Sequence, residues 1–185
     1  MLTEKNMIPA GYLAKHIGSR PDWLKVPHVQ NIYSVSCCMT EDFADYTNFW
    51  RHNGFWLFDS SDIIHEIAKA HSIDISNTTM FYYESYEDEY DERAMKWVKF
   101  RPDENFPVSV RVPDDRILQG FDIVPYSMHT SPECSPLSCN ALAETVEVNA
   151  HCLLNSLEVA KCLLEENDAS RFEPGPYRIF SVYTV

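Results

Sequence analysis

The chain has only five glycines among its 185 residues, and this scarcity limits where its backbone can approach a bound phosphate. The glycine patterns of nucleotide-binding loops are absent, as is the Gly-x-Ser-x-Gly turn that carries the nucleophile of many hydrolases. The sequence therefore disfavours the usual nucleotide-dependent chemistry, and we expect no cofactor.

Long apolar runs are also missing. None approaches the roughly 20 residues that a membrane-spanning helix requires, and residues 1–9 lack the basic flank and apolar stretch of an export signal. The six cysteines include no Cys-x-x-Cys pair, which argues against an ordinary structural zinc site and favours free thiols. We expect a soluble cytoplasmic protein that makes no membrane contact and holds no metal ion.

Basic residues are few as well. The chain carries 15 lysines and arginines against 28 aspartates and glutamates, a formal net charge of −13. Nucleic-acid binding is disfavoured, because contacts to phosphates need clustered Lys and Arg. The excess of carboxylates has two interpretations: a plain solvated surface, or an acidic face that docks onto a basic protein.

Apolar residues make up 45% of the chain and aromatic residues 13%, enough for a substantial core. The clearest pattern is a repeat: residues 57–68 and 153–164, 96 positions apart, both run from an apolar pair through Asx-Ser and an acid to apolar positions at helical spacing. At the same offset, the strand-like residues 80–85 correspond to 176–181. The sequence thus predicts a weakly duplicated strand–loop–helix–strand unit.

From this repeat we predict a single α+β domain over residues 29–185, with a mixed sheet of about six or seven strands and three main helices. The pseudo-repeat halves are residues 29–90 and 117–185. No low-complexity linker separates them, so we expect both halves to share one core.

Residues 1–28 are expected to form a peripheral arm, with a short helix at 11–17 and with Trp23 as a contact for self-association. A strand at 29–35 then leads to a helix that Thr40 caps. Aromatic side chains at spacings of three and four mark one face of this helix: Phe43, Tyr46, Phe49 and Trp50.

A run of carboxylates at 84–92 holds six acids in nine positions, and basic residues follow it. Opposite charges in such a segment can pair across a hairpin, and the run lacks the residue order of a calcium loop. It is interpreted as a solvated hairpin or as a protein-docking patch. The residues of that docking patch are Tyr86, Glu87, Asp88, Glu89 and Tyr90.

The segment 129–140 concentrates thiols, hydroxyls and an amide around two prolines. Its candidate catalytic residues are Cys134 or Cys139 as nucleophile and His129 as base, with His151 as the alternative base, because a thiolate needs a basic neighbour. If the halves correspond, the cysteine-bearing loop of the first half leaves an equivalent strand end, and the two loops converge on one ligand site. The candidate ligand-binding residues are Cys37, Cys38, Ser135, Ser138 and Asn140.

Two other interpretations of this segment stay open. In one, His129, Cys134 and Cys139 ligate a metal ion together with the cysteines of the first half or with the His151-Cys152 pair. In the other, the thiols are small buried hydrophobes and the hydroxyls satisfy a tight structural loop.

For function, the sequence favours a small acidic interaction or regulatory protein that binds a basic protein partner. In size and charge it resembles inhibitors of the immunity-protein kind, and the resemblance extends no further. The alternative is a small cysteine- or metal-dependent enzyme that uses the 129–140 loop.

Overall fold

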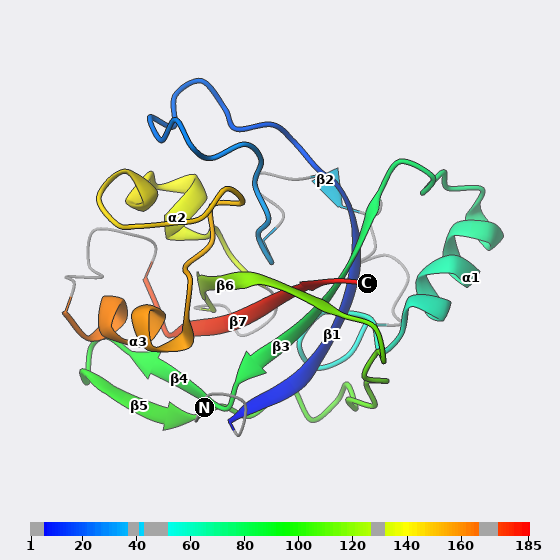
Figure 1. Cartoon of the computed structure of the whole chain (residues 1–185). Helices are drawn as coiled ribbons and strands as arrows, with labels where there is room; N and C mark the ends of the chain where they lie inside the picture. The colour runs from blue at the N-terminus through cyan, green and yellow to red at the C-terminus, as the bar shows by residue number, and fades with distance from the viewer. Residues whose placement is uncertain (1–5, 37–40, 43–51, 127–131, 167–173) are drawn as a thin grey trace.

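One antiparallel sheet forms the centre of the molecule (Figure 1). The computed structural model describes residues 6–36, 41–42, 52–126, 132–166 and 174–185. The seven strands follow the order β2-β1-β3-β7-β4-β5, and β6 pairs with β7. The elements are β1 (Met7–His16), β2 (Glu41–Asp42), α1 (Ser61–His71), β3 (Thr79–Tyr86), β4 (Asp88–Asp91), β5 (Lys96–Lys99), β6 (Ile117–Pro125), α2 (Pro136–Cys139), the 3-10 helix η2 (Leu142–Glu144), α3 (Leu157–Glu166) and β7 (Tyr177–Thr184).

The α+β class predicted from the sequence is confirmed. The sheet differs in one respect, because every pairing among the described strands is antiparallel, whereas the sequence predicted a mixed sheet. Antiparallel neighbours need only short connections, while parallel ones need a crossover.

Strand β1 lies inside the sheet, between β2 and β3. Its residues 10–15 are buried without alternation, the pattern of a strand covered on both faces. The helix predicted over residues 11–17 is therefore wrong, and residues 7–16 do not belong to a peripheral arm. A short apolar run does not by itself distinguish a buried strand from a helix, and here pairing with β3 decided the outcome.

The chain after β1 follows an irregular path. Residues 29–35, predicted as a strand, form only an isolated bridge, between Asn31 and Ser19. Trp23 in this part of the chain is 46% exposed. The helix predicted after Thr40 is replaced at its start by β2. The predicted aromatic stripe lies outside the described residues: Phe43, Tyr46, Phe49 and Trp50.

Two matching asparagines tie a loop to a strand in each half of the sheet. The Asn53 side-chain amide donates to the Ala10 carbonyl at 2.8 Å, and its oxygen accepts from two backbone amides of its own loop. The Asn149 amide donates to the Gln119 carbonyl at 2.6 Å, and its oxygen accepts from two amides at the same spacing along its loop. The two halves thus use one hydrogen-bond pattern.

The same two loops pack closely against a glycine of the adjacent strand, in β1 and in β6. Gly11 has a φ of +141° and Gly120 a φ of +147°, which side-chain-bearing residues rarely adopt. An added Cβ would lie 2.6 Å from Leu57 Cβ at the first glycine and 2.7 Å from Leu153 Cβ at the second. Only glycine allows this close approach of loop and strand.

Strands β3 and β7 lie side by side at the centre of the sheet, where Tyr83 pairs with Val182. Tyr83 is also the partner of Gly11, and Val182 is the partner of Gly120. The central strands therefore correspond at an offset of 99, whereas the sequence predicted 96 for residues 80–85. Because the difference is odd, the predicted alignment places the wrong side chains on each face. A common origin of the halves stays a prediction.

Helices α1 and α3 lie at opposite ends of the sheet (Figure 1). The Ser60 hydroxyl accepts a hydrogen bond from Ile63 N at 3.4 Å at the start of α1, and the Ser156 hydroxyl accepts one from Val159 N at 3.2 Å at the start of α3. Both helices were predicted at these positions and are confirmed. Their buried residues are Ile64, Ile67 and Ala68 in α1, and Leu157, Ala160, Leu163 and Leu164 in α3.

The strand register separates the side chains of the sheet into two faces. Pairing of Leu13 with Phe81, and of Asp122 with Phe180, fixes the first face. Residues that alternate with these occupy the second face. The first face carries Lys15, Asp122 and Arg178, and the second carries Tyr12, Met80 and Tyr86.

Candidate functional site

The segment 132–140 returns toward the end of β6, where Glu133 N donates to the Pro125 carbonyl at 3.1 Å. It contains the short helix α2, which the sequence did not predict. The predicted site residues of this segment differ in exposure: Ser135 and Ser138 are buried, Cys134 and Cys139 are half-buried, and Asn140 is exposed.

The structure brings the two cysteine-bearing segments into contact beside these residues. Ser135 N donates to Ser36 Oγ at 3.4 Å, and these serines are neighbours of Cys134 and Cys37 in the chain. Three predicted site residues lie outside the described residues: Cys37, Cys38 and His129. The nucleophile–base pair therefore stays a prediction.

A buried carboxylate occupies the point where the segments meet. Asp122 accepts hydrogen bonds from Ser34 Oγ at 2.7 Å and from Ser135 Oγ at 2.6 Å. The backbone amides of Val35 and Ile123 donate to it as well, at 3.0 and 2.9 Å. Burial raises the pKa of Asp122, and these hydrogen bonds act in the opposite direction. Sequence reasoning missed this residue because a single acid in an apolar strand carries no motif.

A buried lysine holds the other side of the same segment. Lys15 is fully buried, and its Nζ donates to the carbonyls of Ser34, Val35 and Ser36 at 2.8, 3.2 and 2.8 Å. Residues 34–36 are thus fixed between β1 and β6. The arrangement is a cross-link whose donors and acceptors are matched, which is the condition for burying such groups.

The thiols of the described residues form no disulfide with one another: Cys134, Cys139, Cys152 and Cys162. Burial, together with the nearby Asp122 carboxylate, raises the pKa of Cys152 to about 12. Cys152 therefore remains a protonated, unreactive thiol at neutral pH. Cys162 is exposed on α3.

The acidic run covers the end of β3 and strand β4, and β4 forms a hairpin with the basic strand β5. Asp88 pairs with Lys99 in register and makes an ion pair with it at 3.5 Å, so the predicted pairing of charges across a hairpin is confirmed. Glu87 also contacts Lys99. The tyrosines of the predicted docking patch are buried: Tyr86 and Tyr90 are only 5% and 4% exposed and pack in the core, and of the two only Tyr86 also lines the cleft beside α3. Aromatic rings next to acids in sequence point inward when the strand alternates.

Glu89 of the predicted patch is half-buried, and its charge acts on a buried cation. Arg178 is fully buried among aromatic rings, with its guanidinium carbon 5.0 Å from the Phe55 ring centre and 5.2 Å from that of Tyr126. Burial lowers the pKa of Arg178, while the charge of Glu89 opposes this shift. The Glu89 carboxylate therefore helps to keep the buried guanidinium charged.

A cleft of about 350 Å³ lies beside α3 and is called the α3 cleft. Lys161 occupies it: its Nζ donates to Tyr86 Oη at 3.1 Å and lies 4.8 Å from the Tyr86 ring centre and 5.3 Å from that of Trp97. Trp97 Nε1 in turn donates to Glu165 at 2.6 Å. The residues that line the α3 cleft are Asn6, Tyr86, Leu157, Glu158, Lys161, Cys162 and Glu165.

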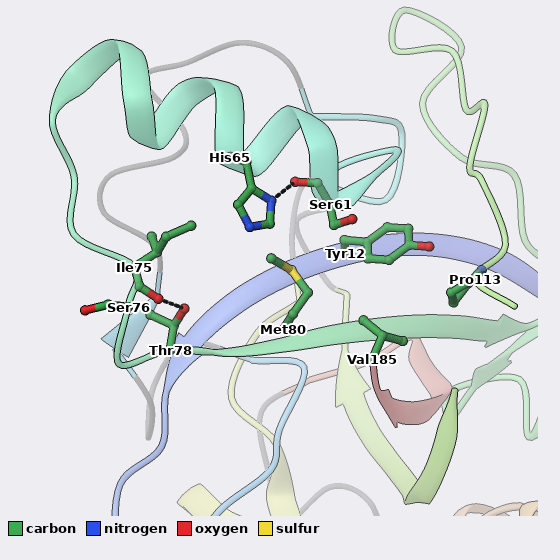
Figure 2. Close-up of a pocket in the computed structure, with 9 residues that line it drawn as sticks. All are labelled: Tyr12, Ser61, His65, Ile75, Ser76, Thr78, Met80, Pro113 and Val185. Atoms are coloured by element: carbon green, nitrogen blue, oxygen red, sulfur yellow. Dashed lines mark hydrogen bonds between the residues drawn. The ribbon is translucent and has the colours of Figure 1, made fainter. Parts of the chain in front are cut away.

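A larger cleft of about 520 Å³ lies between α1 and the sheet and is called the α1 cleft. Figure 2 shows His65 hanging from the helix above Met80, with Tyr12 across the cleft. Its lining residues are Tyr12, Ser61, His65, Ile75, Ser76, Thr78, Met80, Pro113 and Val185. They come from separate parts of the chain, and only the position of His65 one turn after Ser61 could be inferred from sequence.

The two clefts occupy equivalent places in the two halves. His65 and Lys161 stand 96 positions apart, which is the offset of the two helices. Val185 and Tyr86 stand 99 positions apart, which is the offset of the central strands. The same backbone frame thus builds a cleft twice, with different side chains in each.

Within the part of the chain that the structure describes, no helix is long and apolar enough to cross a bilayer. The same residues contain no group of three or more His, Cys, Asp or Glu placed to hold a metal ion.

Comparison with known proteins gives no assignment. No family model matches the chain, and neither a curated protein nor a solved structure matches it. Function must therefore be argued from the molecule itself.

Proposed function

We propose that this chain is a small cytoplasmic interaction protein that binds a basic protein partner through the surface formed by α3 and the β4–β5 hairpin. Trp97 of β5 contacts both Lys161 and Glu165 of α3, and these contacts join the two elements into one surface. Free thiols in the described residues fit a reducing compartment.

The distribution of charge on this surface supports the proposal. Besides the half-buried Glu89, seven half-buried or exposed carboxylates stand against four basic residues, Arg93, Lys96, Lys99 and Lys161. Two of the four cations are already engaged, because Lys99 pairs with Glu87 and Asp88, and Lys161 lies on the aromatic rings. The carboxylates are Glu87, Asp88, Asp91, Glu92, Glu158, Glu165 and Glu166.

One observation carries the proposal: the surface already binds a lysine of its own. The ammonium of Lys161 is held by two aromatic rings and a phenol oxygen, with Glu158 and Glu165 lining the same cleft. Aromatic faces combined with carboxylates are the chemistry that recognises lysine and arginine side chains. A partner that presents such side chains meets a surface that is built for them.

The test removes three charges from this surface and compares a matched control. The first variant carries Glu158→Gln, Glu166→Gln and Asp88→Asn; the control carries Glu104→Gln, Asp114→Asn and Asp115→Asn, which are acids elsewhere in the chain. Binding of an oligolysine peptide is measured by calorimetry at two salt concentrations. We expect the first variant to lose roughly tenfold in affinity at low salt, and the control to lose much less. Equal losses would show that binding follows net charge alone, and would contradict the proposal.

The alternative from the sequence, a cysteine- or metal-dependent enzyme using the 129–140 loop, stays a prediction. No observation on the described residues favours it over the interaction protein, since Ser135 is engaged with Asp122 in a matched network.

A further inference from the structure

We infer that the α1 cleft is a second, separate binding site, which takes an aromatic group that carries an N–H donor and no negative charge. The cleft measures about 520 Å³, which lies in the size range of small-molecule sites. It combines mostly apolar walls with a few polar atoms, the composition that such sites share.

The polar atom that faces the cleft from α1 is a hydrogen-bond acceptor. His65 Nδ1 lies 2.8 Å from the Ser61 carbonyl oxygen. A carbonyl can only accept, so Nδ1 carries the hydrogen and, in the neutral ring, Nε2 carries the lone pair. Figure 2 shows this second nitrogen on the side of the ring that points into the cleft.

Two of the four hydroxyls that line the cleft also use their hydrogens inside the protein. Tyr12 Oη donates to the Arg111 carbonyl at 2.6 Å, and Thr78 Oγ1 donates to the Ile75 carbonyl at 2.8 Å. Burial raises the pKa of Tyr12, so its phenol stays neutral. The Tyr12 and Thr78 oxygens therefore offer lone pairs, and a ligand that supplies a donor matches them.

The apolar walls favour a flat ring. The Met80 thioether lies beneath His65, and the Tyr12 ring and Ile75 flank it (Figure 2). Sulfur–aromatic and ring–ring contacts are both favourable for an aromatic guest. Tyr12 is buried and already packs on Tyr82, with ring centres 5.1 Å apart, so this wall is rigid.

The charges near the cleft disfavour an anion. Two arginines act on Tyr12, and both are already paired with acids: Arg111 with Asp62 at 3.0 Å, and Arg116 with Glu84 at 3.5 Å. The other charged residues next to lining residues in the chain are acids, and like charges repel a carboxylate or phosphate group. They are Glu66, Asp74 and Asp114.

In the equivalent α3 cleft, a side chain of the protein itself supplies the hydrogen-bond donor. There, Lys161 stands in the place of His65, and its ammonium donates to Tyr86 Oη and lies on the aromatic rings. The α3 cleft thus supplies its own donor. In the α1 cleft, the residue at this position is an acceptor, so the donor must come from a ligand.

The experiment uses three probes that differ in one property each: indole, 1-methylindole and indole-3-acetate. Binding is followed through the methyl NMR signal of Met80, assigned with Met80→Leu. We expect indole to shift this signal, 1-methylindole to bind roughly fivefold to tenfold more weakly because it lacks the N–H, and indole-3-acetate to bind more weakly than indole. Equal affinities for indole and 1-methylindole, or an unmoved Met80 signal, would overturn the inference.

Two variants assign the effect to His65. His65→Leu removes the acceptor from an exposed helix position, and we expect it to abolish the preference for indole over 1-methylindole. Lys161→Leu, at the equivalent place in α3, is the matched control and should keep that preference. A preference that survives His65→Leu would refute the assigned hydrogen bond. The probes carry no basic groups, so this result is independent of the oligolysine experiment.

Discussion

The two halves of the sheet share a backbone frame but differ in almost every side chain that could bind a ligand. Each half has a glycine with positive φ under a leucine, an asparagine that ties loop to strand, and a serine at the start of a helix. On this frame, Leu13 of the first half corresponds to Asp122 of the second, and His65 corresponds to Lys161. The frame sets geometry, while the substituted positions set chemistry.

The difference also separates the roles of the two faces. The first face of the sheet carries the matched network of Lys15 and Asp122, which joins the halves through residues 34–36. The second face carries the clefts, where polar atoms are not all satisfied by the protein. Groups that are fully matched inside a protein stabilise it, and groups that are left open are free to bind something else.

We expect the largest loss of stability from substitutions that disrupt the close approach of loop and strand at Gly11 or at Gly120. Gly11→Ala and Gly120→Ala each place a Cβ within 2.8 Å of a loop carbonyl oxygen and force alanine to a positive φ. We expect each to lower the free energy of unfolding by about 3 kcal/mol or more. Urea denaturation followed by circular dichroism measures it. Leu118→Ala, at an exposed position of the same strand as Gly120, is the control and should change little.

If only one glycine variant is strongly destabilised, the two frames are not energetically equivalent. In that case the shared hydrogen-bond pattern would be a geometric likeness without equal weight in stability.

A smaller effect distinguishes the halves. Asn53→Asp and Asn149→Asp each replace the side-chain NH2 group, which donates to a backbone carbonyl, with a carboxylate oxygen. The carbonyl and the new oxygen can then only accept, so neither is satisfied by the other. We expect losses of about 2 kcal/mol at neutral pH. Asn53→Asp should cost more, because its amide also donates to Asp59 at 2.9 Å and the variant sets two carboxylates against each other. Denaturation at matched pH tests this order, with the exposed Asn77→Asp as control. A larger loss at Asn149 would contradict it.

The smallest effect concerns the residue that only the second half has. Burial raises the folded-state pKa of Asp122 above its unfolded value, so the folded chain holds this proton more tightly. Its contribution to stability is then full below the unfolded pKa and declines as pH rises through the folded pKa. Asp122→Asn should remove this decline.

The measurement is the difference in unfolding free energy between wild type and Asp122→Asn, taken at several values from about pH 4 to about pH 8. We expect this difference to move against the wild type as pH rises. A difference that moves in favour of the wild type would show that the four hydrogen bonds outweigh burial, and that the pKa of Asp122 is lowered. Asp114→Asn, an exposed acid, serves as the control.

Local patterns predicted some elements well. Ser60 and Ser156, each followed by an acid and apolar residues at helical spacing, located α1 and α3, because capping and periodicity depend on nearby residues. β3 and β7 were also located, since β-branched and aromatic runs favour strands. β1 was missed because its buried run does not alternate.

The candidate sites were harder to predict. Ser135 was named from its loop, but the partner that occupies it, Asp122, lies on a different strand and has no motif. Tyr86 and Tyr90 were assigned to a surface, although the strand turns both rings into the core. The α1 cleft needs Tyr12, His65 and Val185 together, and no spacing in the sequence relates them.

The sequence by itself determined the overall composition and the local elements: an acidic chain with a large core, two capped helices and the strand segments β3 and β7. The tertiary structure alone decided which strand became the centre of the sheet, which carboxylate was buried and which of two equivalent clefts was filled by its own lysine. The physical reason is that helix caps and strand propensities act over a few residues. Burial, register and cleft lining depend on contacts between residues that are far apart in the chain.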